Sequence, residues 1–190
     1  YLATILGKSE QLLGLITSVL DVSTLDSDRR EPPRLVSLTE IVRSELATLT
    51  PSIDRRRIAV QVRAHTDEQI VGNPRQLRQV VNCLLSNAVK FTDHGRLSLV
   101  AELVAQSPAT ATVRIEVSDT GIGMDAAQAG RLFQPFEQVA EDARRAGGTG
   151  LGLSISQQLV RLMGSRIEVQ GNDETAELLS GWPDRQPSGP

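Results

Sequence analysis

The sequence lacks the features of a secreted, membrane-spanning or nucleic-acid-binding segment. One cysteine, Cys83, among 190 residues excludes an intrachain disulfide and therefore a disulfide-stapled scaffold. No apolar run approaches the roughly 18–20 residues that a helix needs to span a bilayer, so we expect no direct membrane contact in this segment. No signal peptide is visible. A nucleic-acid binder needs a concentrated basic face, which a net charge of −3 does little to support, and we expect no nucleic-acid partner.

The chain does contain enough apolar material for a core, together with clustered glycine. Apolar residues make up 39% and charged residues 23% of the sequence, a balance typical of a folded globular domain. A length of 190 residues suits one domain with a small helical appendage. Of the fifteen glycines, seven fall between Gly121 and Gly152, in a stretch with few strong apolar periods.

Four segments are predicted from the composition along the chain. Residues 1–26 form a helix whose apolar stripe suits a helical bundle, with an ordinary amphipathic helix packed on its own domain as the alternative. Residues 27–36 contain Pro32-Pro33 and are predicted to be a linker. Residues 37–170 are the main domain, and residues 171–190 are a polar tail. The bundle stripe steps by three and four residues: Leu2, Leu6, Ser9, Leu13, Ile16 and Leu20.

The main domain is predicted to be α+β, because it contains both segments whose apolar residues recur at the helical spacing of 3.6 and segments in which every second residue is apolar, as in a strand. Ser37 and Glu40 have capping-box spacing before a helix, and Asn73-Pro74 begins a second, strongly amphipathic helix. A last helix ends at Gly164. The predicted helices cover residues 38–49, 74–91 and 153–163; the predicted strands cover 58–63, 96–104, 111–118 and 166–170, the second and third of them as an antiparallel hairpin.

One edge of the helix over residues 74–91 bears the candidate chemical groups. Cys83, Asn87 and Lys90 lie at i, i+4 and i+7 along this edge, whereas Asn82 lies about 140° away from Asn87 and cannot share the stripe. The Asn87 oxygen suits Mg²⁺, and the Lys90 ammonium suits phosphate. The alternative for Asn87 is a satisfied polar residue at a helix boundary.

Two glycine clusters, residues 119–124 and 147–153, could hold a ligand close to backbone amides. The second leads straight into a helix, whose N-terminal N–H groups and positive dipole end suit phosphate. Neither has the spacing of a dinucleotide-binding fingerprint or of a P-loop, and flexible loops remain the alternative. Asp119, at the end of a strand rich in Val and Ile, can accept a hydrogen bond from an exocyclic amine; the alternative is a plain turn aspartate.

Taken together and in order, these motifs resemble the N, G1, F and G2 boxes of bacterial sensor histidine kinases, most of all the hybrid type. The motifs are Asn87-Ala-x-Lys90-Phe-Thr, Asp119-Thr-Gly-Ile-Gly-Met124, Leu132-Phe-x-Pro-Phe136 and Gly147-Gly-Thr-Gly-Leu-Gly-Leu153. The resemblance extends over about residues 1–170. Residues 1–26 are similar to the second helix of the family's dimerisation and phosphoacceptor hairpin.

The resemblance implies a two-layer α/β sandwich of the Bergerat type, with a mixed sheet covered by helices on one face and one long bundle helix before it. It also implies ATP and Mg²⁺ as cofactors. Asn87 would coordinate Mg²⁺, Lys90 would contact phosphate, and Asp119 would bind the adenine amino group. The remaining implied residues are Gly121, Gly123 and Met124 at the base, Phe133 and Phe136 as lid anchors, Arg144 reaching the terminal phosphate, and Gly148, Thr149, Gly150, Leu151, Gly152 and Leu153 around the phosphates.

The implied reaction is transfer of the γ-phosphoryl group of Mg-ATP to a histidine on the hairpin. The implied partners are a second copy through residues 1–26, the phosphoacceptor hairpin of the parent kinase and a response-regulator receiver domain. The implied location is the cytoplasm, with a parent protein that can be anchored in the inner membrane. Neither His65 nor His94 resembles the acceptor, so we expect none in this segment. An inert nucleotide-binding fragment and a gyrase- or Hsp90-like ATPase are the alternatives.

Three features depart from the family pattern. Cys83 stands where the family has an asparagine and the ATP-hydrolysing relatives have a glutamate; a protonated thiol is a poor general base, which disfavours an ATPase. Cys83 could equally be a small apolar filler. Ala146 replaces a common aromatic before the second glycine cluster. After residue 170 the family's closing strand is not recognisable, which predicts an unpaired sheet edge.

Overall fold

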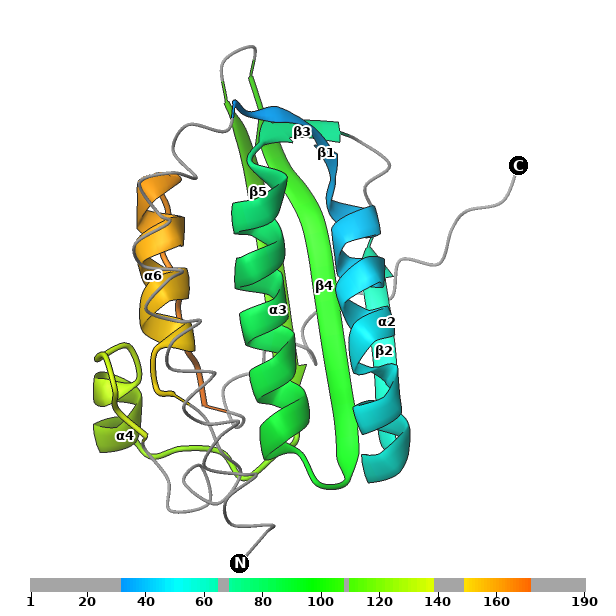
Figure 1. Ribbon diagram of the computed structural model, residues 1–190, viewed down its shortest axis with the longest axis vertical. Helices are drawn as coiled ribbons and strands as arrows, with labels where there is room; N and C mark the ends of the chain where they lie inside the picture. Colours follow the sequence, from blue (N-terminus) through cyan, green and yellow to red (C-terminus); the bar gives the residue numbers. More distant parts are fainter. Residues whose placement is uncertain (1–31, 65–68, 108–109, 139–148, 172–190) are drawn as a thin grey trace, which may run out of the picture.

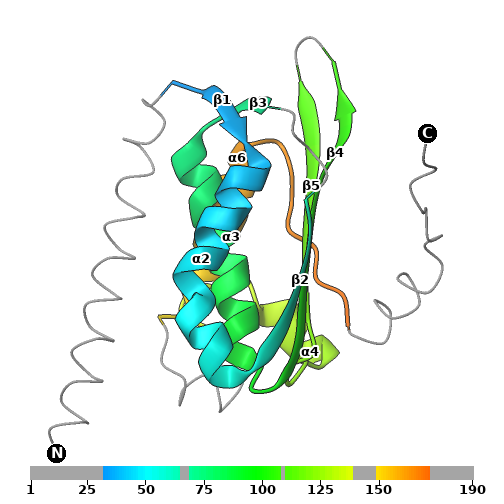
Figure 2. The ribbon, with the colours of Figure 1, turned by 90° about the vertical axis from the view of Figure 1, so that its right-hand side faces the viewer.

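The computed structural model describes residues 32–64, 69–107, 110–138 and 149–171. The helix predicted at residues 1–26 and the tail from residue 172 onward lie outside this part. The described chain forms two layers, with helices on one face of a sheet (Figures 1 and 2). The helices are α2 (Leu38–Arg56), α3 (Pro74–Phe91), α4 (Ala126–Arg131) and α6 (Gly152–Leu162); the strands are β1 (Arg34–Ser37), β2 (Ile58–Ala64), β3 (Gln69–Gly72), β4 (Gly95–Gln106) and β5 (Ala111–Asp119).

The main sheet is mixed, in the order β2-β4-β5. β2 pairs parallel with β4, from Ile58 opposite Gly95 to Ala64 opposite Ala101. β4 and β5 form the predicted antiparallel hairpin, and its last paired residues place Asp119 opposite Leu97. The predicted α+β class and the mixed sheet covered on one face are therefore confirmed, and β5 is an edge strand within the described part.

Local chemistry explains where the two long helices begin. Ser37 caps α2, where its hydroxyl accepts a hydrogen bond from the Glu40 amide at 3.3 Å. Asn73 caps α3 by accepting from the amides of Arg75 and Gln76 at 3.0 and 3.2 Å, and Pro74 takes the first helical position. These bonds satisfy amides that have no partner within the helix. Both predicted helix starts are confirmed.

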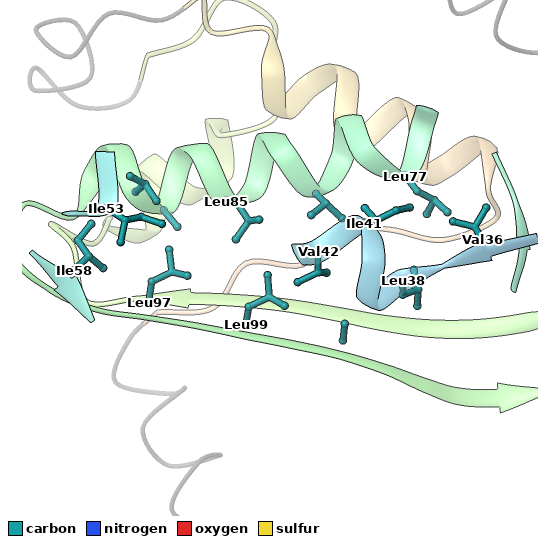
Figure 3. Close-up of a cluster of buried hydrophobic side chains, with 14 of the residues drawn as sticks. Val36, Leu38, Ile41, Val42, Ile53, Ile58, Leu77, Leu85, Leu97 and Leu99 are labelled. Carbon is teal, nitrogen blue, oxygen red and sulfur yellow. The ribbon is translucent and has the colours of Figure 1, made fainter. Parts of the chain in front are cut away.

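The main core lies between the helices and the sheet (Figure 3). Leu85 of α3 and Leu97 and Leu99 of β4 are 0% exposed and lie within it. A second, smaller cluster joins α3 to α6 and contains Val80, Leu151, Ile155 and Leu159. Thus α3 packs on the sheet side and on the α6 side at once.

Four elements differ from the prediction: β1, β3, α4 and the strand expected at 166–170. β1 pairs antiparallel with β3, although residues 34–36 fall within the predicted linker; Leu35 and Val71, which lie opposite each other in this pair, are exposed, so they are not part of an apolar pattern that faces the core. The short helix α4 was not predicted, although Asp125 and Gln128 form a capping box at its start. The predicted strand at 166–170 is wrong: these residues are irregular, and the Ile167 amide donates to the Gln157 side chain at 3.0 Å instead of to a ladder.

Candidate functional site

The predicted stripe on α3 is present, and a side-chain hydrogen bond joins two of its members. The Asn87 amide nitrogen donates to the Cys83 sulfur at 3.7 Å. Asn82 lies on another face of α3, where its amide donates to Glu45 Oε2 of α2 at 2.8 Å. The prediction that Asn82 and Asn87 point to different sides of the helix is confirmed.

Burial changes the titration of two groups on this stripe. Burial raises the pKa of the Cys83 thiol, and the nearby Ser156 and Asn87 side chains oppose this only in part. The thiol is therefore protonated at neutral pH, which makes it a poor base for activating water. Burial lowers the pKa of Lys90, whose ammonium lies 5.0 Å from the centre of the Phe91 ring. A half-buried ammonium with a lowered pKa gains more from an anion than a fully hydrated one does.

Asp119 sits at the end of β5, and one of its carboxylate oxygens is fixed by the chain around it. Oδ1 accepts from the Gly121 amide at 2.9 Å and from the Thr92 hydroxyl at 3.3 Å. Within the described residues, no donor is bound to Oδ2. One oxygen is thus used to orient the carboxylate, and the other remains able to accept a hydrogen bond from a ligand.

Gly121 allows this turn to lie directly against the end of α3. A Cβ at Gly121 would lie 2.3 Å from the Phe91 carbonyl oxygen and 2.7 Å from Asp119 Oδ1. The next amide, of Ile122, donates to the same Phe91 carbonyl at 3.2 Å. Any side chain at residue 121 would push the turn away from α3. Gly123 has φ +65° and open space around it, and Met124 is 43% exposed.

The second glycine cluster leads into α6 as predicted. Gly150 has φ +71°, a conformation that favours glycine, and a Cβ there would lie 2.7 Å from the Phe136 carbonyl carbon. The Phe136 amide donates to the Gly150 carbonyl at 3.0 Å. The Leu151 amide donates to the Thr149 hydroxyl at 3.2 Å. The loop is therefore tied both to itself and to the segment that follows α4.

The N-terminus of α6 has no side-chain cap. Its first helical bond runs from the Ile155 amide to the Leu151 carbonyl at 2.9 Å. In the described part of the chain, the amides of Gly152, Leu153 and Ser154 have no acceptor. Such an end, with free donors and the positive end of the helix dipole, is suited to phosphate.

Both clusters thus flank α3. The Phe91 carbonyl at its C-terminus binds the turn after Asp119, and a Cβ on Gly152 would lie 3.1 Å from the Cys83 sulfur. Phe133 is partly buried, whereas Phe136 is 65% exposed with φ +66°. Arg144 and Gly148 lie outside the described residues, as do Ala146 and His65.

Two polar residues of this region were not singled out from the sequence. Thr92, which holds Asp119, is 0% exposed, and Ser156, beside Cys83, is also 0% exposed. The position of Thr92 directly after an amphipathic helix is a weak signal. Ser156 is a polar residue among the apolar positions of the last helix, and this was the available signal.

Comparisons with known proteins agree with this geometry. The family described as histidine kinase-, DNA gyrase B- and HSP90-like ATPases matches residues 72–184. The sensor protein GacS of Pseudomonas syringae pv. syringae is 34% identical over 173 residues, which cover 89% of this chain and 19% of that protein. The chain therefore belongs to the histidine kinase-, gyrase B- and HSP90-like ATPase family, and its resemblance to the sensor histidine kinases is confirmed.

Solved structures support the same fold. The Acinetobacter baumannii histidine kinase AdeS has a TM-score of 0.71 at 20% identity, covering 90% of this chain and 77% of that chain. Full-length ShkA, solved in complex with AMPPNP, has a TM-score of 0.67 at 28% identity, covering 88% of this chain and 36% of that one. The chain spans about a fifth of the length of GacS. Across the described helices, none is both long and apolar enough to cross a membrane.

Proposed function

We propose that the chain is the ATP-binding kinase domain of a sensor histidine kinase, which transfers the γ-phosphoryl group of Mg-ATP to a histidine on a dimerisation hairpin. The observation that carries this proposal is the Asp119 carboxylate, oriented through Oδ1 and left with Oδ2 able to accept from a ligand. ShkA, whose fold is similar, was solved in complex with AMPPNP, which supports a nucleotide as the ligand of this chain.

The adenine base would bind at the Asp119 turn. Asp119 Oδ2 would accept from the exocyclic amine, while Gly121 allows the turn that bears Asp119 to lie against the end of α3. Gly123 and Met124 would line the outer part of the pocket, where Met124 is 43% exposed and available for contact. This arrangement distinguishes adenine from a base that presents a carbonyl at the same place.

The phosphates would bind between α3 and the N-terminus of α6. The unpaired amides of Gly152 and Leu153 and the ammonium of Lys90 would neutralise phosphate charge, and Thr149 and Gly150 would shape the loop around it. Leu151, which is buried, fixes the helix start behind the phosphates. Gly148 and Arg144 would complete the site, and Phe133 and Phe136 would anchor the lid that contains Arg144.

The residues on α3 fit a magnesium ion held jointly with phosphate. Mg²⁺ takes few protein ligands when a nucleotide supplies the others. The Asn87 amide oxygen would be one such ligand, and it is available for this role while the amide nitrogen donates to the Cys83 sulfur. No cluster of three or more His, Cys, Asp or Glu residues that could hold a metal occurs within the described ranges. When bound, the ion would neutralise charge on the transferred phosphoryl group.

The partners follow from the proposed reaction. A second copy would associate through residues 1–26, the phosphoacceptor hairpin would present the histidine, and a response-regulator receiver domain would take the phosphoryl group from it. We place this domain in the cytoplasm, because its nucleotide and its receiver partner are found there.

A labelling experiment tests the proposal. The chain is mixed with γ-labelled ATP, Mg²⁺ and a separately supplied hairpin that carries a histidine, and label on protein and free phosphate are both measured. We expect acid-labile label on the hairpin. Phosphate release without label would favour an ATPase, and nucleotide binding with neither would favour an inert fragment; either result would contradict the kinase. A hairpin with its histidine changed to alanine is the matched control.

A further inference from the structure

The contact between Cys83 and Asn87 has a consequence for metal binding. An asparagine amide has two faces with opposite chemistry, an NH₂ group that donates and an oxygen that accepts. In this chain the NH₂ group donates to the Cys83 sulfur one helical turn earlier. If the amide rotated by 180°, its oxygen would face the sulfur, where only the weak S–H donor could replace the bond from the NH₂ group.

The sulfur is itself held in place from the α6 side. A Cβ on Gly152 would lie only 3.1 Å from it, so glycine at the first position of α6 allows the thiol to lie against that helix. The Ser156 hydroxyl of α6 is fully buried and has no hydrogen-bond partner among the described residues. The Ser156 side chain lies near enough to Cys83 to lower the pKa of the thiol. Cys83 thus lies between the amide on α3 and helix α6, whose N-terminus would face the phosphates.

We propose that Cys83 is a positioning residue for Asn87: its sulfur binds the amide nitrogen and directs the amide oxygen toward the metal. This inference rests on the proposed function, because it gives Asn87 its metal role. It differs from a filler role for Cys83. A filler contributes packing only, whereas a positioning residue sets which end of the Asn87 amide the metal meets.

Calorimetry with AMPPNP tests this on the 190-residue chain. Binding is measured with Mg²⁺ and with EDTA, and the ratio of the two affinities is compared among variants. We expect Cys83→Ala to reduce this ratio about 10-fold, the usual cost of losing a group that orients a metal ligand. Binding in EDTA should change less than about 2-fold. Cys83→Ser should restore the ratio, because a hydroxyl also accepts from an amide.

Val80→Ala is the matched packing control. Val80 lies in the α3–α6 cluster one turn before Cys83 and makes no part of the proposed nucleotide site. This variant should lower the thermal midpoint yet keep the magnesium ratio. A Cys83→Ala variant that keeps the full ratio, or a Val80→Ala variant that loses it equally, would overturn the positioning role. Failure of the wild-type chain to bind AMPPNP would instead overturn the proposed function.

A nucleotide-free measurement separates these failures further. In an NMR spectrum of the apo chain, the side-chain NH₂ signals of Asn87 are assigned by their loss in Asn87→Asp. Cys83→Ala should move them toward the values of a solvated amide, and Cys83→Ser should return them toward the wild-type positions. Signals that do not move in Cys83→Ala would show that the sulfur does not hold the amide, whatever the nucleotide affinity.

Discussion

The two faces of α3 pack against very different partners. On one face, Leu77, Val81 and Leu85 enter the large core with α2 and the sheet. On the other face, Val80 meets α6 in a cluster that has four buried residues in the described part of the chain. The base side of the proposed site, at Asp119, is built on the sheet, and the phosphate side is built on α6. Segments with few buried contacts open most easily, so we expect the α6 side to open before the sheet side.

The largest effect should come from the sheet-side face. Leu85→Ala removes a fully buried side chain, and we expect it to lower the free energy of unfolding by about 2–5 kcal/mol in urea denaturation. Leu159→Ala removes the same atoms from the smaller cluster, and it should speed amide exchange in α6 more than in α2 or β4. Equal acceleration everywhere would contradict the distinction between the two faces. Leu35→Ala, at a 63% exposed position, is the control and should change stability by less than about 0.5 kcal/mol.

The next largest effect is expected on ATP affinity, from a substitution that changes only the base side of the proposed site. Asp119→Asn keeps an oxygen that can accept from Gly121 and Thr92, so the fold should survive, but an NH₂ group would then face the adenine amine. A hydrogen bond to a charged group contributes about 1.5–3 kcal/mol, so ATP affinity should fall about 10- to 100-fold by calorimetry.

The same measurement with ITP supplies the control for Asp119. ITP lacks the exocyclic amine, and the wild-type chain should bind it more weakly than ATP. Asp119→Asn should remove most of that preference. Unchanged ATP affinity in the variant would exclude Asp119 from the base pocket.

A smaller effect is expected at the loop before α6. Gly150→Ala imposes a left-handed conformation on alanine and places a Cβ 2.7 Å from the Phe136 backbone. The conformation alone costs about 1–3 kcal/mol, and the contact adds to it. Gly164 has φ +77° and open space around it, so Gly164→Ala should lower the free energy of unfolding only by the conformational cost. Equal unfolding midpoints for the two variants would show that the Phe136 contact contributes nothing.

The smallest effect concerns Lys90, between the two halves. Burial holds its pKa below the ordinary 10.5, so between the two pKa values the unfolded chain binds more protons and stability rises with pH. Lys90→Met should remove this rise and slightly increase stability at neutral pH, while it weakens ATP binding. Urea unfolding at pH 7 and pH 10 measures the first effect. A wild-type chain whose stability rises no more than that of Lys90→Met over this range would contradict the direction given for Lys90.

The elements predicted most accurately from the sequence are those with a regular apolar spacing and a clear N-cap residue. The stripe from Leu77 to Ala88 and the cap at Asn73 located α3 correctly, because both signals are local. β1 and β3 escaped prediction because each has four residues and gains its stability from pairing over a distance in the chain. The strand predicted at 166–170 failed because alternation shows only a preference for extended backbone, and a ladder requires a partner. For the site, residue types indicated Asn87 and Asp119, but only coordinates could reveal which atoms of each are already bonded.

The bond between the Phe136 amide and the Gly150 carbonyl links the surface next to α4 to the phosphate side of the proposed site. Phe136 is 65% exposed, yet its backbone is fixed to the loop that begins α6. A ligand that moved this loop would either move Phe136 or break this bond. By thermodynamic reciprocity, a partner protein whose affinity for Phe136 depends on bound nucleotide would change nucleotide affinity by the same factor that nucleotide changes the affinity of the partner.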